Sequence, residues 1–143
     1  YLGNPLACAA SLAVQRVIHR DGLLAKVQED GAFFGALLRE TFADHPHVGD
    51  VRGRGFFWGI ELVADKAEKR PFDPALKVNA NLKKDAMARG LLCYPFGGTV
   101  DGVNGDHVLL APPYIASRDE LKTIASLLAE SVDAITRQAA IAA

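Results

Sequence analysis

Apolar residues recur with a helical period in four stretches of this chain, and capping signals mark the ends of several of them. Asn4 and Pro5 are typical of a helix start, and Ser117 with Glu120 forms a capping box, a hydroxyl three residues before a carboxylate. Gly90 suits the position that follows a helix. The pattern predicts helices over residues 6–20, 23–42 and 75–89, and a last helix after the capping box.

Between the second helix and the last one, parts of the chain change to the period of β-strands. The pattern predicts a short strand over 48–55 that enters a glycine turn, a strand over 56–63 with mostly buried faces, and later strands over 91–94 and 107–111. A charged loop (64–74) and a glycine-rich loop (95–106) complete this region. Short strands in this order predict an α+β fold, with a small sheet of three or four strands and helices on one face.

The composition is typical of a globular chain with one core. The chain has 143 residues, 50% of them hydrophobic, with 16 Lys+Arg against 17 Asp+Glu. The net charge of -1 gives no reason to expect nucleic acid or an acidic membrane as a partner. No apolar run approaches the roughly 18 residues that span a bilayer, so we expect no membrane partner.

The two cysteines and the first residue indicate a cellular location and a relation to a longer protein. Cys8 and Cys93 are far apart and lack the density of a secreted disulfide scaffold, which favours a reducing compartment and hence a cytoplasmic location. The chain opens at Tyr1 without an initiator methionine, so we expect a segment of a longer protein.

No group of residues in the sequence completes an active site. His45 and His47 flank a proline without a third ligand at metal-binding spacing, so no metal site is expected. The lysines fall on charged helix faces or in the polar loop, where nothing depresses the pKa of a nucleophile. Taken without a family, the residues predict a stable accessory domain.

Two arginines beside the first glycine turn have two interpretations. The turn Gly53-Arg54-Gly55 does not match a phosphate-binding loop. Arg52 and Arg54 have the chemistry to bind a carboxylate bidentately, and equally to form structural ion pairs, for example with Asp50 or Glu61. Both interpretations remain open at this point.

Four separated motifs occur in the order and spacing of one known family. They are the helix opening YLGNPLACAA (1–10), the strand pair VRGRGFFWGIEL (51–62), the segment GLLC (90–93) and the Pro-Pro segment LLAPPYI (109–115). Together they resemble the C-terminal portion of class III (omega-type) aminotransferases. These enzymes depend on pyridoxal phosphate (PLP) and have the aspartate-aminotransferase fold, PLP fold type I. The resemblance implies that the α+β unit is their small C-terminal domain.

The resemblance also implies what lies outside this chain. In the family, the Schiff-base lysine and the acidic partner of the pyridine nitrogen lie upstream in the large domain, so no catalytic residue is expected here. Residues 1–20 would be the end of the large domain with its connecting helix, and residues 21–143 the small domain. Tyr1 and Leu2 would adjoin the residue that contacts the cofactor phosphate.

For the intact enzyme the resemblance implies a homodimer. It would use pyridoxal 5'-phosphate to pass an amino group from an amine or amino acid donor to a keto acid. The segment alone would neither hold the cofactor nor transaminate.

The loop before the Pro-Pro segment departs from the family pattern. Many relatives carry an arginine there that clamps a substrate carboxylate, but here no arginine or lysine lies between Gly90 and Ser117. Tyr94 and His107 are the polar groups left to meet a substrate, and Arg54 is the nearby cation. We therefore expect this loop to face a neutral or amine-bearing part of the donor. Two alternatives stay open: a related PLP enzyme with decarboxylase, racemase or aminomutase chemistry, and a free-standing non-catalytic domain.

Overall fold

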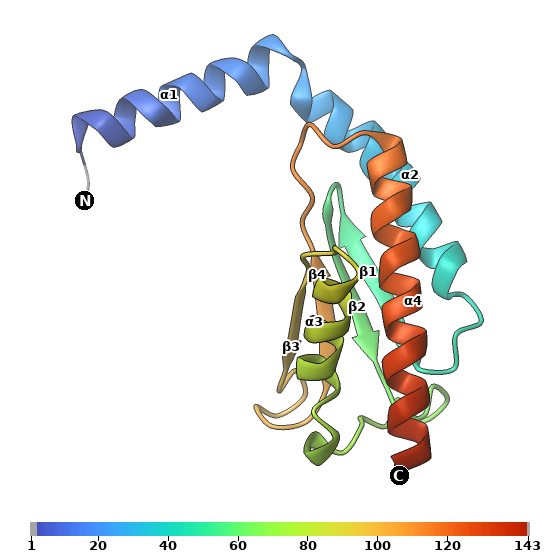
Figure 1. Ribbon diagram of the computed structural model, residues 1–143. Coiled ribbons are helices and arrows are strands. Elements are labelled where there is room, and N and C mark those ends of the chain that lie inside the picture. Colours follow the sequence, from blue (N-terminus) through green and yellow to red (C-terminus); the bar gives the residue numbers. More distant parts are fainter. Residues whose placement is uncertain (1–2, 143) are drawn as a thin grey trace.

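A four-stranded antiparallel sheet covered by helices forms the body of the protein in the computed structural model, which describes residues 3–142 (Figure 1). The strands are β1 (Val48–Arg54), β2 (Phe57–Leu62), β3 (Tyr94–Gly97) and β4 (Asp106–Leu110), in the spatial order β1-β2-β4-β3. Helices α2 (Leu23–Phe42), α3 (Val78–Ala88) and α4 (Arg118–Ala142) lie on one face of this sheet. The predicted α+β class is confirmed, with four strands.

Alternate residues of the sheet face the helices and form the core. Trp58, Ile60 and Leu62 on β2 are buried, whereas Phe57 is 61% exposed. The strand expected over 56–63 is mostly buried, but its second side is only partly covered, because the helices lie on one side of the sheet. The second side is left open, and it carries the candidate site.

The strand expected over 91–94 lies three residues further along the chain. Leu91 is buried in the core, and pairing begins only at Tyr94, which lies opposite Leu109. Pro95 is accommodated because β3 is an edge strand, where a missing N–H donor is tolerated. The expected glycine-rich loop therefore shortens to residues 98–105.

The helix expected over 75–89 is interrupted near its start. Pro74–Leu76 form a 3-10 turn, Lys77 adopts a positive φ of 51°, and α3 follows from Val78. The left-handed backbone of Lys77 therefore separates the 3-10 turn from α3. The capping box after the Pro-Pro segment forms as predicted, with Glu120 N–H donating to Ser117 Oγ at 3.2 Å and Ser117 N–H donating to the Glu120 carboxylate at 2.7 Å.

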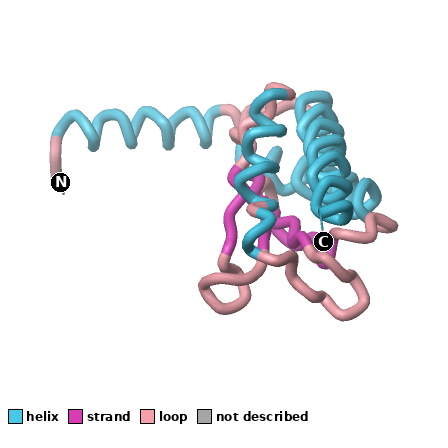
Figure 2. The backbone as a smooth tube through the Cα atoms, turned by 60° about the horizontal axis from the view of Figure 1, so that its bottom comes forward, coloured by secondary structure: helices cyan, strands magenta, loops and turns pink. Residues whose placement is uncertain are grey.

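Helix α1 (Pro5–Arg20) extends away from the body (Figure 2). The Asn4 side chain accepts a hydrogen bond from Ala7 N–H at 3.1 Å, as a helix cap does. None of the residues of α1 is buried, and Gly22 makes the elbow to α2 with a φ of 61°. An alanine-rich apolar helix is thus left without a packing partner among the described residues.

Two close approaches fix α2 against the sheet. A Cβ on Gly35 would overlap the ring of Trp58, and a Cβ on Gly31 would overlap the backbone of Gly55. The Trp58 indole N–H donates to Gly55 O at 2.7 Å, which ties the β1–β2 turn to the same place. Among residues 3–142, no helix combines the length and apolar character that crossing a membrane requires.

Candidate functional site on the open sheet face

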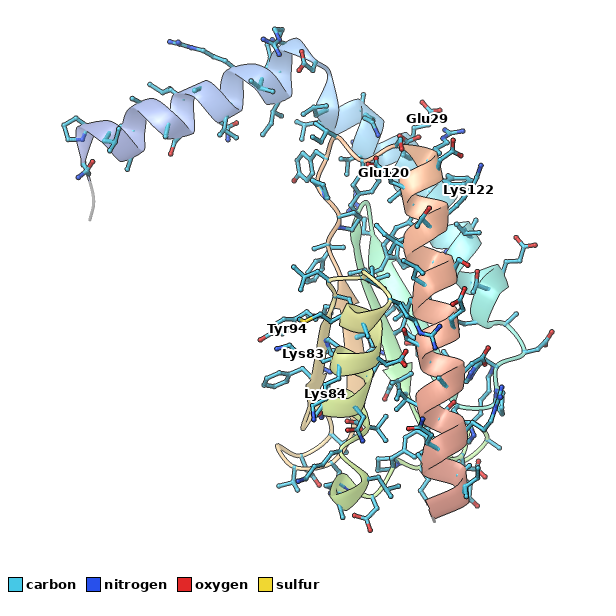
Figure 3. The ribbon with its side chains drawn as sticks, in the orientation of Figure 1. Glu29, Lys83, Lys84, Tyr94, Glu120 and Lys122 are labelled. Atoms are coloured by element: carbon cyan, nitrogen blue, oxygen red, sulfur yellow. The ribbon has the colours of Figure 1, made fainter. Side chains whose placement is uncertain are left out.

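Cross-strand register gathers the predicted Tyr94 and His107 on the open face of the sheet. His107 pairs with Glu61 on one side and Phe96 on the other, and Tyr94 pairs with Leu109. The rings of Tyr94 and Phe96 are stacked with centroids 5.9 Å apart, and Phe96 meets His107 edge-on at 6.2 Å. Figure 3 shows Tyr94 on the β3 side, pointing away from the body. The structure thus brings together the two groups that the sequence proposed for the substrate.

The imidazole of His107 favours its neutral form. Burial lowers the pKa of His107, and the charge of Arg52 lowers it further, while Asp106 and Glu61 act in the opposite direction. Its Nδ1 atom is buried and has no hydrogen-bond partner within the described part of the chain. A neutral imidazole is a hydrogen-bonding group and does not attract an anion by charge.

Arg52 has the structural role that the sequence left open. Its guanidinium donates to Asp50 at 2.8 Å and to Glu61 at 2.9 Å, and both carboxylates raise its pKa. A hollow of about 400 Å³ lies beside it, with Arg52, Phe57, Gly59, Thr99, His107 and Leu109 among its lining residues. This hollow is the polar-edged part of the open face.

Arg54 lies apart from Tyr94 and His107. It pairs with Phe57 at the far end of β1 and makes no ion pair within residues 3–142. It lines a groove of about 640 Å³ formed by the start of α2, the β1–β2 turn and the Pro112–Tyr114 segment. The three predicted substrate residues therefore do not form one cluster.

The loop between β3 and β4 is a closed hairpin. Gly98 N–H donates to Gly105 O at 2.8 Å, and Val100 N–H donates to Asn104 O at 2.9 Å. Hydrogen bonds from the backbone and side chain of Asn104 and from Val103 N–H lower the pKa of Asp101 to about 2. The internal hydrogen bonds give this loop a defined shape beside the aromatic stack.

The setting of Lys26 is a feature that the sequence analysis missed. Its ammonium group donates to Asp30 at 2.6 Å and to Ala116 O at 2.5 Å, and it lies 5.5 Å from the centre of the Phe56 ring. The four-residue spacing of Lys26 and Asp30 on one helix was the available signal. The ammonium is engaged by a carboxylate and a carbonyl, so Lys26 is a structural lysine.

A lysine that could hold a cofactor aldehyde would have to reach a hollow. Lys66 lines a small pocket, but its ammonium donates to Ala43 O at 2.7 Å and His45 O at 3.2 Å. None of the other hollows described above has a lysine in its lining. Tyr1 and Leu2, expected next to the cofactor phosphate, lie outside the described residues. No group of three or more metal ligands occurs within residues 3–142.

Comparison with known proteins identifies the family. A family model described as aminotransferase class-III matches residues 1–132. The chain belongs to the class III aminotransferases. It is 46% identical over 132 residues to an uncharacterized aminotransferase of Schizosaccharomyces pombe, and 37% identical over 147 aligned residues to the diaminobutyrate–2-oxoglutarate transaminase of Halomonas elongata.

The structural comparison agrees with the family assignment. A PLP-bound aminotransferase mutant from Vibrio fluvialis superposes with a TM-score of 0.85 at 31% identity, over 96% of this chain and 28% of that one. The S. pombe and H. elongata alignments cover 92% and 100% of this chain, but only 29% and 30% of the relatives. The chain thus spans less than a third of the class III enzymes that it matches, and its fold is that of a part of them.

Proposed function

We propose that this chain is the small C-terminal domain of a PLP-dependent class III aminotransferase of full family length. In that enzyme, an amino group passes from an amine or amino acid to a keto acid. The family match over residues 1–132 is the observation that carries the proposal. Residues 1–20 end the large domain with its connecting helix, and residues 21–143 form the small domain. The unburied helix α1 supports this boundary, because its apolar side chains need a partner outside the described body.

The same proposal assigns covalent catalysis and cofactor attachment to the rest of the enzyme. Lys26 and Lys66 are held by carboxylate and carbonyl oxygens. The segment alone is therefore inactive. The intact enzyme is a cytoplasmic homodimer, a location consistent with the two free cysteines Cys8 and Cys93.

The open sheet face contributes to the choice of donor. Tyr94 and neutral His107 offer hydrogen bonds without a net positive charge, so they suit a neutral or amine-bearing part of a donor better than a carboxylate. A diaminobutyrate transaminase among the relatives, whose named substrate carries a second amine, is consistent with this assignment.

The cofactor assignment is tested with the 143-residue chain and pyridoxal phosphate. We expect no stoichiometric adduct after borohydride reduction, whereas the enzyme of full family length should give one adduct per subunit. Peptide mapping locates any adduct. One adduct per chain at a single lysine of this segment would contradict the proposal.

The donor assignment is tested by kinetics of the full-length enzyme with an amine-bearing donor and pyruvate. Tyr94→Phe and His107→Ala should each lower kcat/KM by about tenfold, which is about 1.4 kcal/mol of transition-state binding. Glu130→Gln, an exposed change on α4, serves as the control. If both site variants match the parent while Arg54→Ala abolishes binding of a dicarboxylic substrate, the donor assignment is wrong.

A further inference from the structure

The guanidinium of Arg54 is an unpaired cation at the edge of a preformed groove. Its neighbour Arg52, two residues earlier on β1, is bound by two carboxylates, whereas the guanidinium of Arg54 has no ion pair or hydrogen bond with the described residues. No acidic residue lines the groove beside it. The groove therefore presents one positive charge without a local counter-charge.

The rest of the groove is mainly apolar. Its lining includes Leu24 and Val27 of α2, Phe56 of the β1–β2 turn, Phe57 of β2, and Pro112 and Pro113. Leu24 and Phe57 are each 61% exposed, so the groove has apolar surface to cover. Tyr114 also lines it and brings a phenol hydroxyl.

Three fixed contacts hold the walls in place. Gly31 packs directly on the backbone of Gly55, and the Trp58 indole N–H donates to Gly55 O at 2.7 Å, so the turn that carries Arg54 is fastened to α2. On the other wall, Lys26 donates to Ala116 O at 2.5 Å. Arg118, the first residue of α4, continues this cluster through Asp30 at 2.7 Å and Glu29 at 2.6 Å. Figure 3 labels Glu29 near the start of α4. A groove with anchored walls loses little conformational freedom when it binds a ligand.

We propose that this groove binds a small amphipathic carboxylate, with the carboxylate on Arg54 and its hydrocarbon part against Leu24, Val27 and Pro112. The chemistry follows from charge complementarity: an apolar lining favours a hydrocarbon, and the unpaired guanidinium pairs bidentately with a carboxylate. The binding uses only residues of this chain and needs neither the cofactor nor amino transfer. Its failure would leave the proposed function untouched.

The test uses 4-phenylbutyrate as the probe and the 143-residue chain labelled with 15N. We expect saturable amide shifts at Gly55 and Tyr114, with a dissociation constant in the millimolar range of a fragment-sized ligand. The uncharged analogue 4-phenylbutanol should bind at least about tenfold more weakly, because it cannot form the charged pair.

Variants separate the guanidinium from the general charge of the protein. Arg54→Gln should weaken binding by about tenfold or more. The affinity of Arg54→Lys should lie between those of the parent and Arg54→Gln, because lysine keeps the charge and loses the bidentate geometry. Arg137→Gln removes an exposed arginine on α4 and should leave the dissociation constant unchanged. Unshifted amide signals in the core of each variant verify the fold.

Three results would overturn the proposal. One is an absence of saturable shifts, and another is equal affinity for the alcohol or for Arg54→Gln, which would indicate an apolar surface without a carboxylate site. The third is a shift of Gly55 and Tyr114 with protein concentration alone, which would mean that a second copy of the chain occupies the groove.

Discussion

The carboxylate of Asp106 accepts a hydrogen bond from the backbone N–H of Asn79 at 3.2 Å, so a residue of β4 caps the start of α3. The residue before α3, Lys77, has a left-handed backbone and provides no side-chain cap. A negative charge at a helix N-terminus also interacts favourably with the helix dipole. Asp106 is 5% exposed and thus joins the sheet to α3 from within the core.

Removing this cap should destabilise the fold. Asp106→Ala leaves the amide of Asn79 without its acceptor and should lower the free energy of unfolding by about 1–2 kcal/mol, as measured by urea denaturation. Asp106→Asn keeps an acceptor oxygen and should lose less. An Ala variant as stable as the parent would show that the bond contributes nothing.

Asp106 and Asp30 should give the stability opposite dependences on pH. Burial raises the pKa of Asp106 above its ordinary 3.8, so the stability linked to its ionisation is fully present below that value and is lost as the pH rises through the raised pKa, while the oxygen can still accept the Asn79 hydrogen bond. Hydrogen bonds from Lys26 and Arg118 lower the pKa of Asp30, so its contribution is present above 3.8 and is lost as the pH falls through the lowered pKa.

The Asp30 part of this dependence is measurable by acid titration of unfolding. Asp30→Asn should cost about 2 kcal/mol near neutral pH, because the Lys26 ammonium, with a side chain 30% exposed, loses its charged partner. The loss should shrink below pH 3.8. If the free energy of unfolding of the variant depended on pH below about 5 just as that of the parent does, the role assigned to this carboxylate would be contradicted.

Gly35 should not tolerate a methyl group. Gly35→Ala places a Cβ in the ring of Trp58, so we expect a loss of about 1–3 kcal/mol in thermal or urea unfolding. Gly59→Ala is the matched control, since its Cβ would meet Leu109 at an ordinary 3.6 Å. Equal stabilities of the two variants would mean that α2 does not approach the sheet as closely as described.

Helix α1 should cause the isolated chain to associate. Leu6, Leu12 and Val14 are 80%, 57% and 56% exposed, and such an apolar surface is covered in stable proteins. Sedimentation analysis at tens of micromolar should show species larger than a monomer. Leu12→Gln should shift the distribution towards monomer, and a parent chain that sediments as a clean monomer would refute the prediction.

Periodicity predicted the helices and the fold class well because these depend on local spacing. Residues 6–20 and 23–42 carry apolar side chains at helical intervals, and α1 and α2 begin and end within one residue of those limits. The position of β3 was missed because it depends on pairing with β4. The apolar residues 91–93 look like a strand, yet Leu91 is drawn into the core and the pairs form from Tyr94 onward.

The candidate site was predictable residue by residue but not as an arrangement. Tyr94 and His107 stood out because the loop lacks cations, yet the intervening Phe96 that contacts both rings follows only from the β3–β4 register. Arg52 and Arg54 looked alike in sequence. In the structure the two arginines have different partners. The carboxylate of Glu61 on the neighbouring strand reaches Arg52, whereas Arg54 makes no such ion pair with the described residues.

Pro95 has a consequence for how copies of this domain meet. An edge strand with free N–H and C=O groups invites a strand from another chain, and a proline within it removes a donor that such pairing would need. β3 is one edge of this sheet and has only four residues, one of which is Pro95. Growth of the sheet from molecule to molecule is thereby hindered at the β3 edge, and β1 is left as the edge strand without a proline.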